Sequence, residues 1–124
     1  MDVVIADSQA KIRSAVRLML DQQPHLEVLG EAVDATGLMD WVKASSPDLV
    51  LLDWGLPGLE AETVLLAMRA RAPRLRVIAL SGRPEAEEAA LQAGADAFVS
   101  KGDPPEKLLA AIDRVCVGRR QSKQ

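Results

Sequence analysis

The stretch Pro47-Asp48-Leu49-Val50-Leu51-Leu52-Asp53 decides the fold class of this chain. Its four central residues are all apolar, and they lie between a proline-aspartate pair and a second aspartate. An apolar run of this length without alternation predicts a strand covered on both faces, which is typical of parallel sheets. Three further runs have the same character and one is more mixed: residues 3–6, 77–80 and 97–99, and the mixed run 26–29.

Segments with helical periodicity separate these runs. The first follows Ser8, a candidate N-cap, and its apolar face contains Ile12, Ala15, Val16, Met19 and Leu20. The other expected helices lie, in chain order, around residues 38–42, 59–72, 84–93 and 104–116. Strands that alternate with helices predict βαβ units with right-handed crossovers. We therefore expect an α/β fold, a doubly wound five-stranded parallel sheet with five helices.

The chain has the size and composition of one globular domain. It contains 124 residues, of which 48% are hydrophobic and 27% are charged, a balance too apolar for a disordered chain. We place the domain at residues 1–118 and expect the basic residues 119–124 to form a disordered tail. The single cysteine, Cys116, excludes an internal disulfide and a multi-cysteine metal site, and the lone His25 excludes a site built from several histidines.

Charge and hydropathy disfavour two further classes of protein. The net charge of −3 provides no basic field for phosphate backbones, so we expect no direct nucleic-acid binding by this domain. The longest strictly apolar runs have five residues, whereas a membrane-spanning helix needs about 20. No charged leader precedes the first strand. We therefore expect no membrane span, no signal peptide and a cytoplasmic location.

Polar residues end four of the expected strands: Asp7, Asp53, Ser81 and Lys101. In an open parallel sheet, ligands bind beyond the carboxyl ends of the strands, where the strand order reverses. If the first and third strands flank that point, Asp7 and Asp53 face each other, and two close carboxylates repel unless a proton or cation separates them. An all-oxygen site suits Mg²⁺, whereas a lysine and a hydroxyl suit phosphoryl oxygens. The pattern therefore predicts a site for phosphoryl chemistry.

Five blocks of the sequence resemble the receiver domain of two-component response regulators, and together they extend over the whole chain. The blocks are residues 3–7, 47–53, 56–58, 79–82 and 94–101. The resemblance implies the fold of the chemotaxis regulators, a flavodoxin-like sheet with strand order 2-1-3-4-5. It also implies a signalling domain rather than an enzyme, with at most self-catalysed phosphotransfer and autodephosphorylation.

The same resemblance implies a phosphoacceptor and a metal site. Asp53 would accept a phosphoryl group from a histidine kinase or a phosphotransfer protein. Asp7, Asp53 and the backbone carbonyl of Gly55 would be the ligands of Mg²⁺. A carboxylate is a competent nucleophile toward an activated phosphoryl donor, so the chemistry suits these residues.

The resemblance also implies a switch. Ser81 would be the switch hydroxyl that moves toward the new phosphoryl group, and Lys101 would be the charge partner of that group. Phe98 would be the switch aromatic, which reports the change to the face formed by the fourth helix, the fifth strand and the last helix. An output protein or a second copy in a homodimer would bind that face.

Ser8 departs from the family pattern, because the family usually has a second acidic metal ligand at this position. A serine can offer only a neutral oxygen, so we expect Mg²⁺ to bind weakly. The alternative is a pseudo-receiver, which binds partners without phosphorylation. An aspartate-based phosphohydrolase is disfavoured because Gly55 stands where those enzymes place a second aspartate. A flavin-binding module of the same topology is disfavoured further, since the chain lacks a phosphate-binding loop.

Overall fold

A computed structural model describes residues 1–122 of the chain, with side chains for residues 1–116. Strands and helices alternate along it, and a short 3-10 helix precedes the fourth α-helix. In chain order the elements are β1 (Asp2–Ala6), α1 (Ala10–Asp21), β2 (Glu27–Ala32), α2 (Ala35–Ser45), β3 (Leu49–Asp53), α3 (Ala61–Arg71), β4 (Arg76–Ser81), η1 (Pro84–Ala86), α4 (Glu87–Gln92), β5 (Ala97–Ser100) and α5 (Pro105–Ser122).

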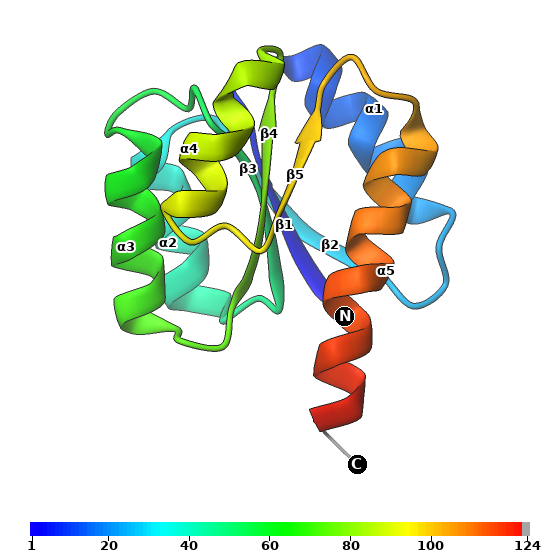
Figure 1. Cartoon of the computed structure of the whole chain (residues 1–124). Coiled ribbons are helices and arrows are strands. Elements are labelled where there is room, and N and C mark those ends of the chain that lie inside the picture. The colour runs from blue at the N-terminus through cyan, green and yellow to red at the C-terminus, as the bar shows by residue number, and fades with distance from the viewer. Residues whose placement is uncertain (123–124) are drawn as a thin grey trace.

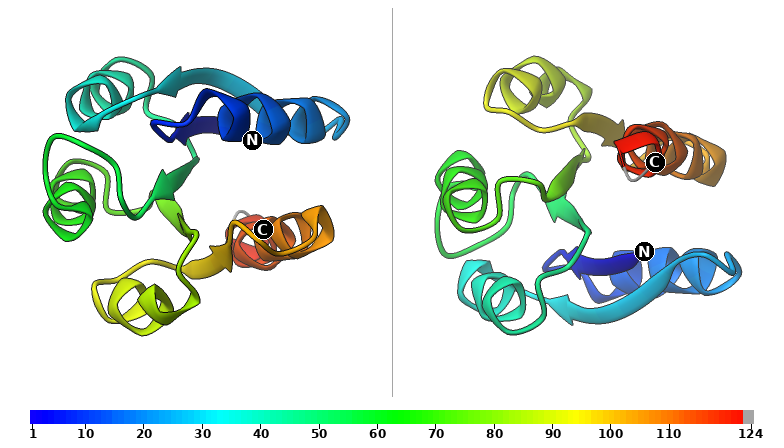
Figure 2. Two further views of the ribbon diagram at one scale, coloured as in Figure 1. Left: turned by 90° about the horizontal axis from the view of Figure 1, so that it is seen from above. Right: turned by 90° about the horizontal axis from the view of Figure 1, so that it is seen from below.

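The strands of the described residues form one parallel sheet in the order β2-β1-β3-β4-β5. Helices α1 and α5 cover one face of this sheet, and α2, α3 and α4 cover the other (Figures 1 and 2). The expected fold class and strand order are confirmed. The order reverses between β1 and β3, and the carboxyl ends of the strands lie together at the upper edge of the molecule in Figure 1.

Alternation along each central strand supplies two apolar clusters, one on each face of the sheet. Val4 and Ala6 of β1 pack toward α2, α3 and α4, whereas Val3 and Ile5 pack toward α1 and α5. All five residues of β3 are buried. Each fully buried Val, Leu or Ile stabilises the fold by about 1.5–3 kcal/mol. The two clusters fix the strands in register, and this register sets which residues meet at the upper edge.

The edge strand β2 is longer than the sequence predicts, spanning Glu27–Ala32 instead of residues 26–29. Its second half contains Gly30 and Glu31, which break the apolar pattern. A Cβ atom at Gly30 would overlap the ring of Trp41, and the indole Nε1 of Trp41 donates a hydrogen bond to the Glu31 carbonyl oxygen at 3.2 Å. The strand therefore continues through Gly30 and Glu31, because Trp41 of α2 packs against the backbone there.

Three helix boundaries also differ from the prediction. Ser8 is not the N-cap of α1; the cap residue is Gln9, whose side chain makes no capping bond. The single helix expected over residues 84–93 consists of η1 followed by α4. Helix α5 continues to Ser122, past the expected end at residue 116, and residues 123–124 lie outside the described part of the chain. The domain bounds 1–118 stay a prediction.

Within residues 1–122, none of the helices combines the length and the hydropathy needed to cross a membrane.

Candidate functional site

Three of the predicted site residues meet at the carboxyl edge of the sheet. Asp7 follows β1, Asp53 ends β3 and Lys101 follows β5. The ammonium Nζ of Lys101 lies 2.7 Å from Asp7 Oδ2 and 3.3 Å from Asp53 Oδ1. The parallel pairing of β3 with both β1 and β4 places the two aspartates on either side of the strand-order reversal. The predicted meeting of the two carboxylates is observed, with a lysine cation between them.

Burial strengthens the interaction of these charges. Asp7 is fully buried, Asp53 is 6% exposed, and the Lys101 side chain is 13% exposed. Ionic attraction is larger here than at a solvated surface, because less water screens it. Removing one partner of such a set would leave a buried charge without compensation.

Backbone N–H groups orient both carboxylates. Gln9 N–H donates to Asp7 Oδ1 at 2.8 Å, and Gly55 N–H donates to Asp53 Oδ1 at 3.0 Å. Among the described residues, no backbone N–H group donates to the second oxygen, Oδ2, of either carboxylate. Asp7 Oδ2 is buried without a hydrogen bond from the described residues, and its ionic partner is Lys101.

This donor set fits a hard cation only in part. The Oδ2 oxygens of Asp7 and Asp53 are ligands of the kind that Mg²⁺ prefers, and that of Asp7 is paired with Lys101. However, the described residues contain no group of three or more His, Cys, Asp or Glu side chains placed to hold a metal ion. Ser8, at the position of the usual second acidic ligand, is exposed and uncharged. An ion here would therefore retain several water ligands.

Ser81 and Phe98 lie beside the acidic cluster rather than in it. Ser81 ends β4, is 8% exposed, and its Oγ accepts a hydrogen bond from Arg83 N–H at 3.1 Å. Phe98 in β5 pairs with Ala79 of β4 and packs, half-buried, against the cluster under α2, α3 and α4. Among the described residues, neither side chain forms a hydrogen bond with Asp53.

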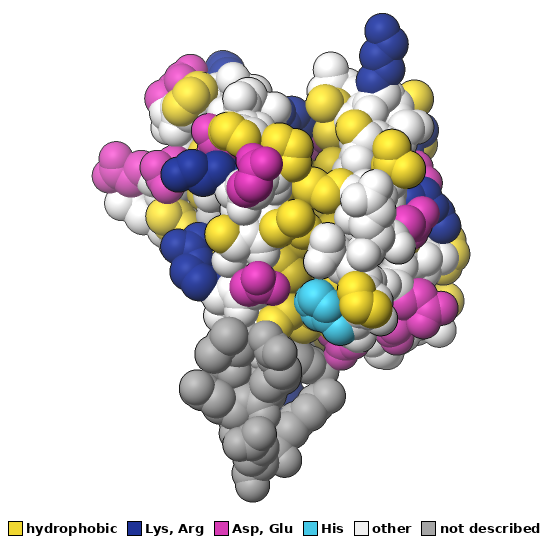
Figure 3. Space-filling view, turned by 90° about the vertical axis from the view of Figure 1, so that its right-hand side faces the viewer, with side chains coloured by type: hydrophobic (Ala, Val, Ile, Leu, Met, Phe, Trp, Pro, Cys, Tyr) yellow, Lys and Arg dark blue, Asp and Glu magenta, His cyan; other side chains and the backbone are white. Residues whose placement is uncertain are grey.

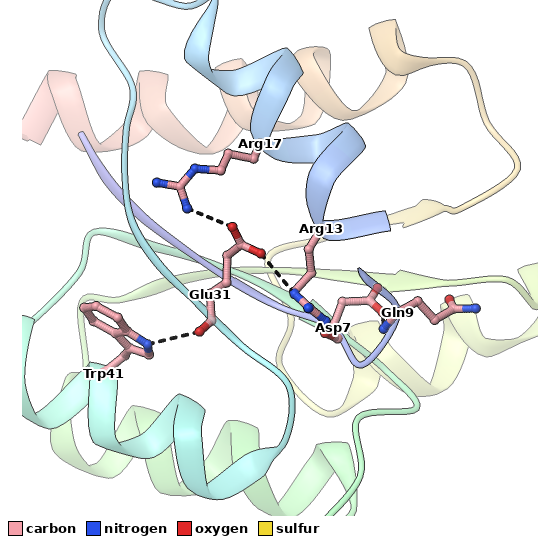
Figure 4. A network of polar contacts seen from close by, with 6 residues as sticks. All are labelled: Asp7, Gln9, Arg13, Arg17, Glu31 and Trp41. Carbon is pink, nitrogen blue, oxygen red and sulfur yellow. Dashed lines mark hydrogen bonds and ion pairs between the residues drawn. The ribbon is translucent and has the colours of Figure 1, made fainter. Parts of the chain in front are cut away.

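Sequence reasoning missed a polar network that supports the β1–α1 loop (Figure 4). Arg13 donates through Nη1 to the Asp7 carbonyl oxygen at 2.8 Å and through Nε to Glu31 Oε1 at 3.0 Å. Arg17 binds the second oxygen of Glu31 at 2.8 Å. The signals available in the sequence were two basic residues four positions apart on the first helix and an acidic residue, Glu31, between Gly30 and Ala32 of the second strand.

The same network shifts the titration of Glu31. The hydrogen bond from Arg17 lowers the pKa of Glu31 most, and the hydrogen bond from Arg13 lowers it further, while burial opposes both. Glu31 therefore remains ionised to lower pH than a solvated glutamate, and it keeps Arg13 in contact with the loop that carries Asp7.

An apolar groove runs beside the site between α1 and α5. Hydrophobic side chains gather in this seam in Figure 3. The groove has a volume of about 180 Å³ and reaches Lys101 at its upper end. Its lining comprises Ile12, Ala15, Val16, Met19, Leu80, Val99, Ser100, Lys101, Asp103, Pro104, Pro105 and Leu108.

Comparison with known proteins gives the family. The profile of the response regulator receiver domain matches residues 3–113. The chain belongs to this family, and it is the receiver domain of a two-component response regulator.

Two of the relatives are bacterial regulatory proteins of greater length. The chain is 29% identical to the nitrate/nitrite response regulator protein NarL of Escherichia coli K12, over 94% of this chain and 55% of that protein. It is 32% identical to the transcriptional regulatory protein YhcZ of Bacillus subtilis, over 88% of this chain and 52% of that protein. The chain thus spans about half the length of these curated relatives.

A solved structure confirms the fold. The signal receiver domain of the response regulator NarL from Mycobacterium tuberculosis superposes with a TM-score of 0.81 and 32% identity, covering 92% of this chain and 94% of that one. Receiver domains of this type are signalling domains and not enzymes of the usual kind.

Proposed function

We propose that this domain accepts a phosphoryl group on Asp53 from a histidine kinase or a phosphotransfer protein, in the cytoplasm, and thereby switches a partner-binding surface. The observation that carries the proposal is the cluster of Asp7, Asp53 and Lys101, in which the acceptor carboxylate lies 3.3 Å from a fixed cation. Phosphoryl transfer depends mainly on positioning and charge neutralisation, and both are built into this cluster.

The free oxygen of Asp53 is the nucleophile in this proposal. Asp53 Oδ1 is occupied by the Gly55 N–H, so Oδ2 attacks phosphorus while the bond from phosphorus to the donor nitrogen breaks and the donor imidazole leaves. Lys101 then neutralises charge on the transferred group. Mg²⁺, held by the carboxylates of Asp7 and Asp53 and the Gly55 carbonyl, would supply further charge neutralisation and alignment.

The signal would leave the site through Ser81 and Phe98. The Ser81 hydroxyl now accepts a hydrogen bond from Arg83 N–H, and on phosphorylation it would turn to donate to a phosphoryl oxygen. This movement frees space for Phe98 in the adjacent strand. The surface of α4, β5 and α5 would then change its affinity for an output protein or for a second copy of the domain.

Ser8 favours one alternative, a pseudo-receiver that binds partners without phosphorylation. Its support is the composition of the site, which holds two acidic side chains and an exposed neutral serine. Loss of one carboxylate weakens metal binding by about ten- to a hundredfold, so the two functions differ in whether phosphate is taken up at high Mg²⁺.

Intact-mass measurement after incubation with acetyl phosphate or phosphoramidate and Mg²⁺ tests the proposal. Wild type should gain one phosphoryl group, and Asp53→Asn should gain none, because an amide lacks the nucleophilic oxygen. Asp40→Asn, at an exposed position of α2, is the matched control and should be labelled like wild type. Equal labelling of wild type and Asp53→Asn would refute Asp53 as acceptor, and no labelling of wild type at any Mg²⁺ concentration would favour the pseudo-receiver.

A further inference from the structure

We propose that Gln9 is a positioning residue that holds the Lys101 ammonium in its resting place. It thereby opposes the movement of this ammonium group toward a phosphoryl group on Asp53. The inference rests on the proposed function and deepens it. The observation is a hydrogen bond between residues 92 positions apart: Lys101 Nζ donates to Gln9 Oε1 at 3.1 Å. The sequence offered no sign of this contact, since neither composition nor periodicity relates the two residues.

The contact completes the surroundings of the ammonium group. A lysine ammonium has three N–H donors. Three oxygens lie within reach of Nζ: Asp7 Oδ2 at 2.7 Å, Gln9 Oε1 at 3.1 Å and Asp53 Oδ1 at 3.3 Å. Two carboxylate oxygens and one amide oxygen therefore surround the resting ammonium group, and a phosphoryl oxygen must replace one of the three.

The charge and burial of each acceptor determine how strongly it competes with the phosphoryl group for the Lys101 ammonium. Asp7 is buried and close, so that ion pair persists. Asp53 Oδ1 loses its charge when Asp53 becomes an acyl phosphate, and its attraction for Lys101 falls with it. The remaining competitor is the neutral amide of Gln9, which is exposed and can be replaced at moderate cost. Gln9 thus adjusts the position of Lys101 without blocking its movement.

The backbone of Gln9 is fixed, which makes the contact specific. Its N–H donates to Asp7 Oδ1 at 2.8 Å, and its carbonyl oxygen accepts from the N–H groups of Ile12 and Arg13, each at 3.1 Å. Arg13 in turn binds the Asp7 carbonyl oxygen. The side chain of Gln9 therefore starts from a defined place beside Asp7 (Figure 4).

The first measurement concerns the resting protein and needs no phosphoryl ligand. The ¹⁵N-detected signal of the Lys101 ammonium should be sharp in wild type, because its protons are hydrogen-bonded and exchange slowly with water. Gln9→Ala should broaden it through faster exchange, and Gln9→Glu, which keeps an acceptor oxygen at the same reach, should restore it. Gln22→Ala, at the other end of α1, is the control and should leave it unchanged. An unchanged signal in Gln9→Ala would overturn the inference.

The second measurement uses beryllofluoride as a phosphoryl analogue, with bound fluoride detected by ¹⁹F NMR at saturating Mg²⁺. Gln9→Ala should bind it about three- to tenfold more tightly than wild type, the scale of one partly exposed hydrogen bond to a charged group. Equal or weaker binding would overturn the inference while leaving the proposed function intact. If neither protein binds beryllofluoride, the proposed function fails, and so does the proposal that Gln9 opposes movement of Lys101 toward a phosphoryl group. The ammonium signal then still decides whether Gln9 holds Lys101 in the resting protein.

Discussion

The carboxylate of Asp7, fully buried after β1, is paired at 2.7 Å with the ammonium of Lys101 after β5. Strands β1 and β5 are not neighbours in the sheet, since β3 and β4 lie between them. The pair therefore bridges the upper edge of the sheet above Asp53, the proposed phosphoacceptor. The same lysine neutralises a buried charge and, in the proposed function, would neutralise charge on the transferred phosphoryl group.

Lys101→Met should destabilise the protein in the absence of metal. The substitution leaves Asp7 and Asp53 close together without a cation, and breaking a buried ion pair in this way costs about 3 kcal/mol. Urea unfolding with a chelator measures the loss, and Lys107→Met, at an exposed position of α5, provides the control. A urea unfolding curve like that of wild type would show that the Asp7–Lys101 pair does not stabilise the fold.

Ser8→Asp should tighten Mg²⁺ binding about ten- to a hundredfold, because it restores a third negative charge at the site. The same substitution should lower the stability of the metal-free protein, since a third carboxylate joins Asp7 and Asp53. Metal titration and thermal melts with a chelator measure the two effects on one pair of proteins. Ser14→Asp adds the same charge at an exposed position of α1 and should do neither. If Ser8→Asp changes neither property, Ser8 does not face the site.

Glu31→Gln should reduce stability at neutral pH by about 1 kcal/mol, the scale of a partly exposed ion pair with good geometry. Arg17 and Arg13 lower the folded-state pKa of Glu31 below the unfolded value of 4.5. The contribution of Glu31 is therefore fully present above pH 4.5 and is lost as the pH falls through the folded-state pKa. Urea unfolding of both proteins should show a gap at pH 7 that narrows below pH 4.5. Glu27→Gln, exposed in the same strand, is the control, and a gap independent of pH would contradict the prediction.

Beryllofluoride should move the backbone amide signals of Phe98 and its neighbours in α5, if the Ser81 hydroxyl couples the site to this face. Ser81→Ala should still bind the analogue through Lys101 but should shift the amides near Phe98 less, because no hydroxyl is drawn toward the ligand. Heteronuclear NMR titration of both proteins measures the difference. Ser45→Ala, whose hydroxyl donates within α2, is the control. Identical shifts near Phe98 with and without the Ser81 hydroxyl would exclude this route.

Much of the fold could be predicted from local pattern. Runs such as Leu49–Asp53 are apolar at consecutive positions because both faces of a central parallel strand are covered. The length of the edge strand β2 was underestimated, because Gly30 and Glu31 interrupt the apolar pattern. In the fold, the Trp41 ring packs against Gly30, and arginines of α1 bind Glu31. The cap of α1 was misplaced by one residue because the side chain of Asp7, rather than Ser8, receives the N–H of the loop.

The sequence by itself determined the class of fold, the strand ends that carry polar groups and the family, because periodicity and short motifs record local burial and local chemistry. The tertiary structure alone decided which of those groups meet. Asp7, Asp53 and Lys101 come together because strands distant along the chain end at one edge of the sheet, and Gln9 reaches Lys101 across 92 residues for the same reason. Such contacts depend on how whole helices and strands pack together. The residues that form the contacts therefore show no periodic pattern in the sequence.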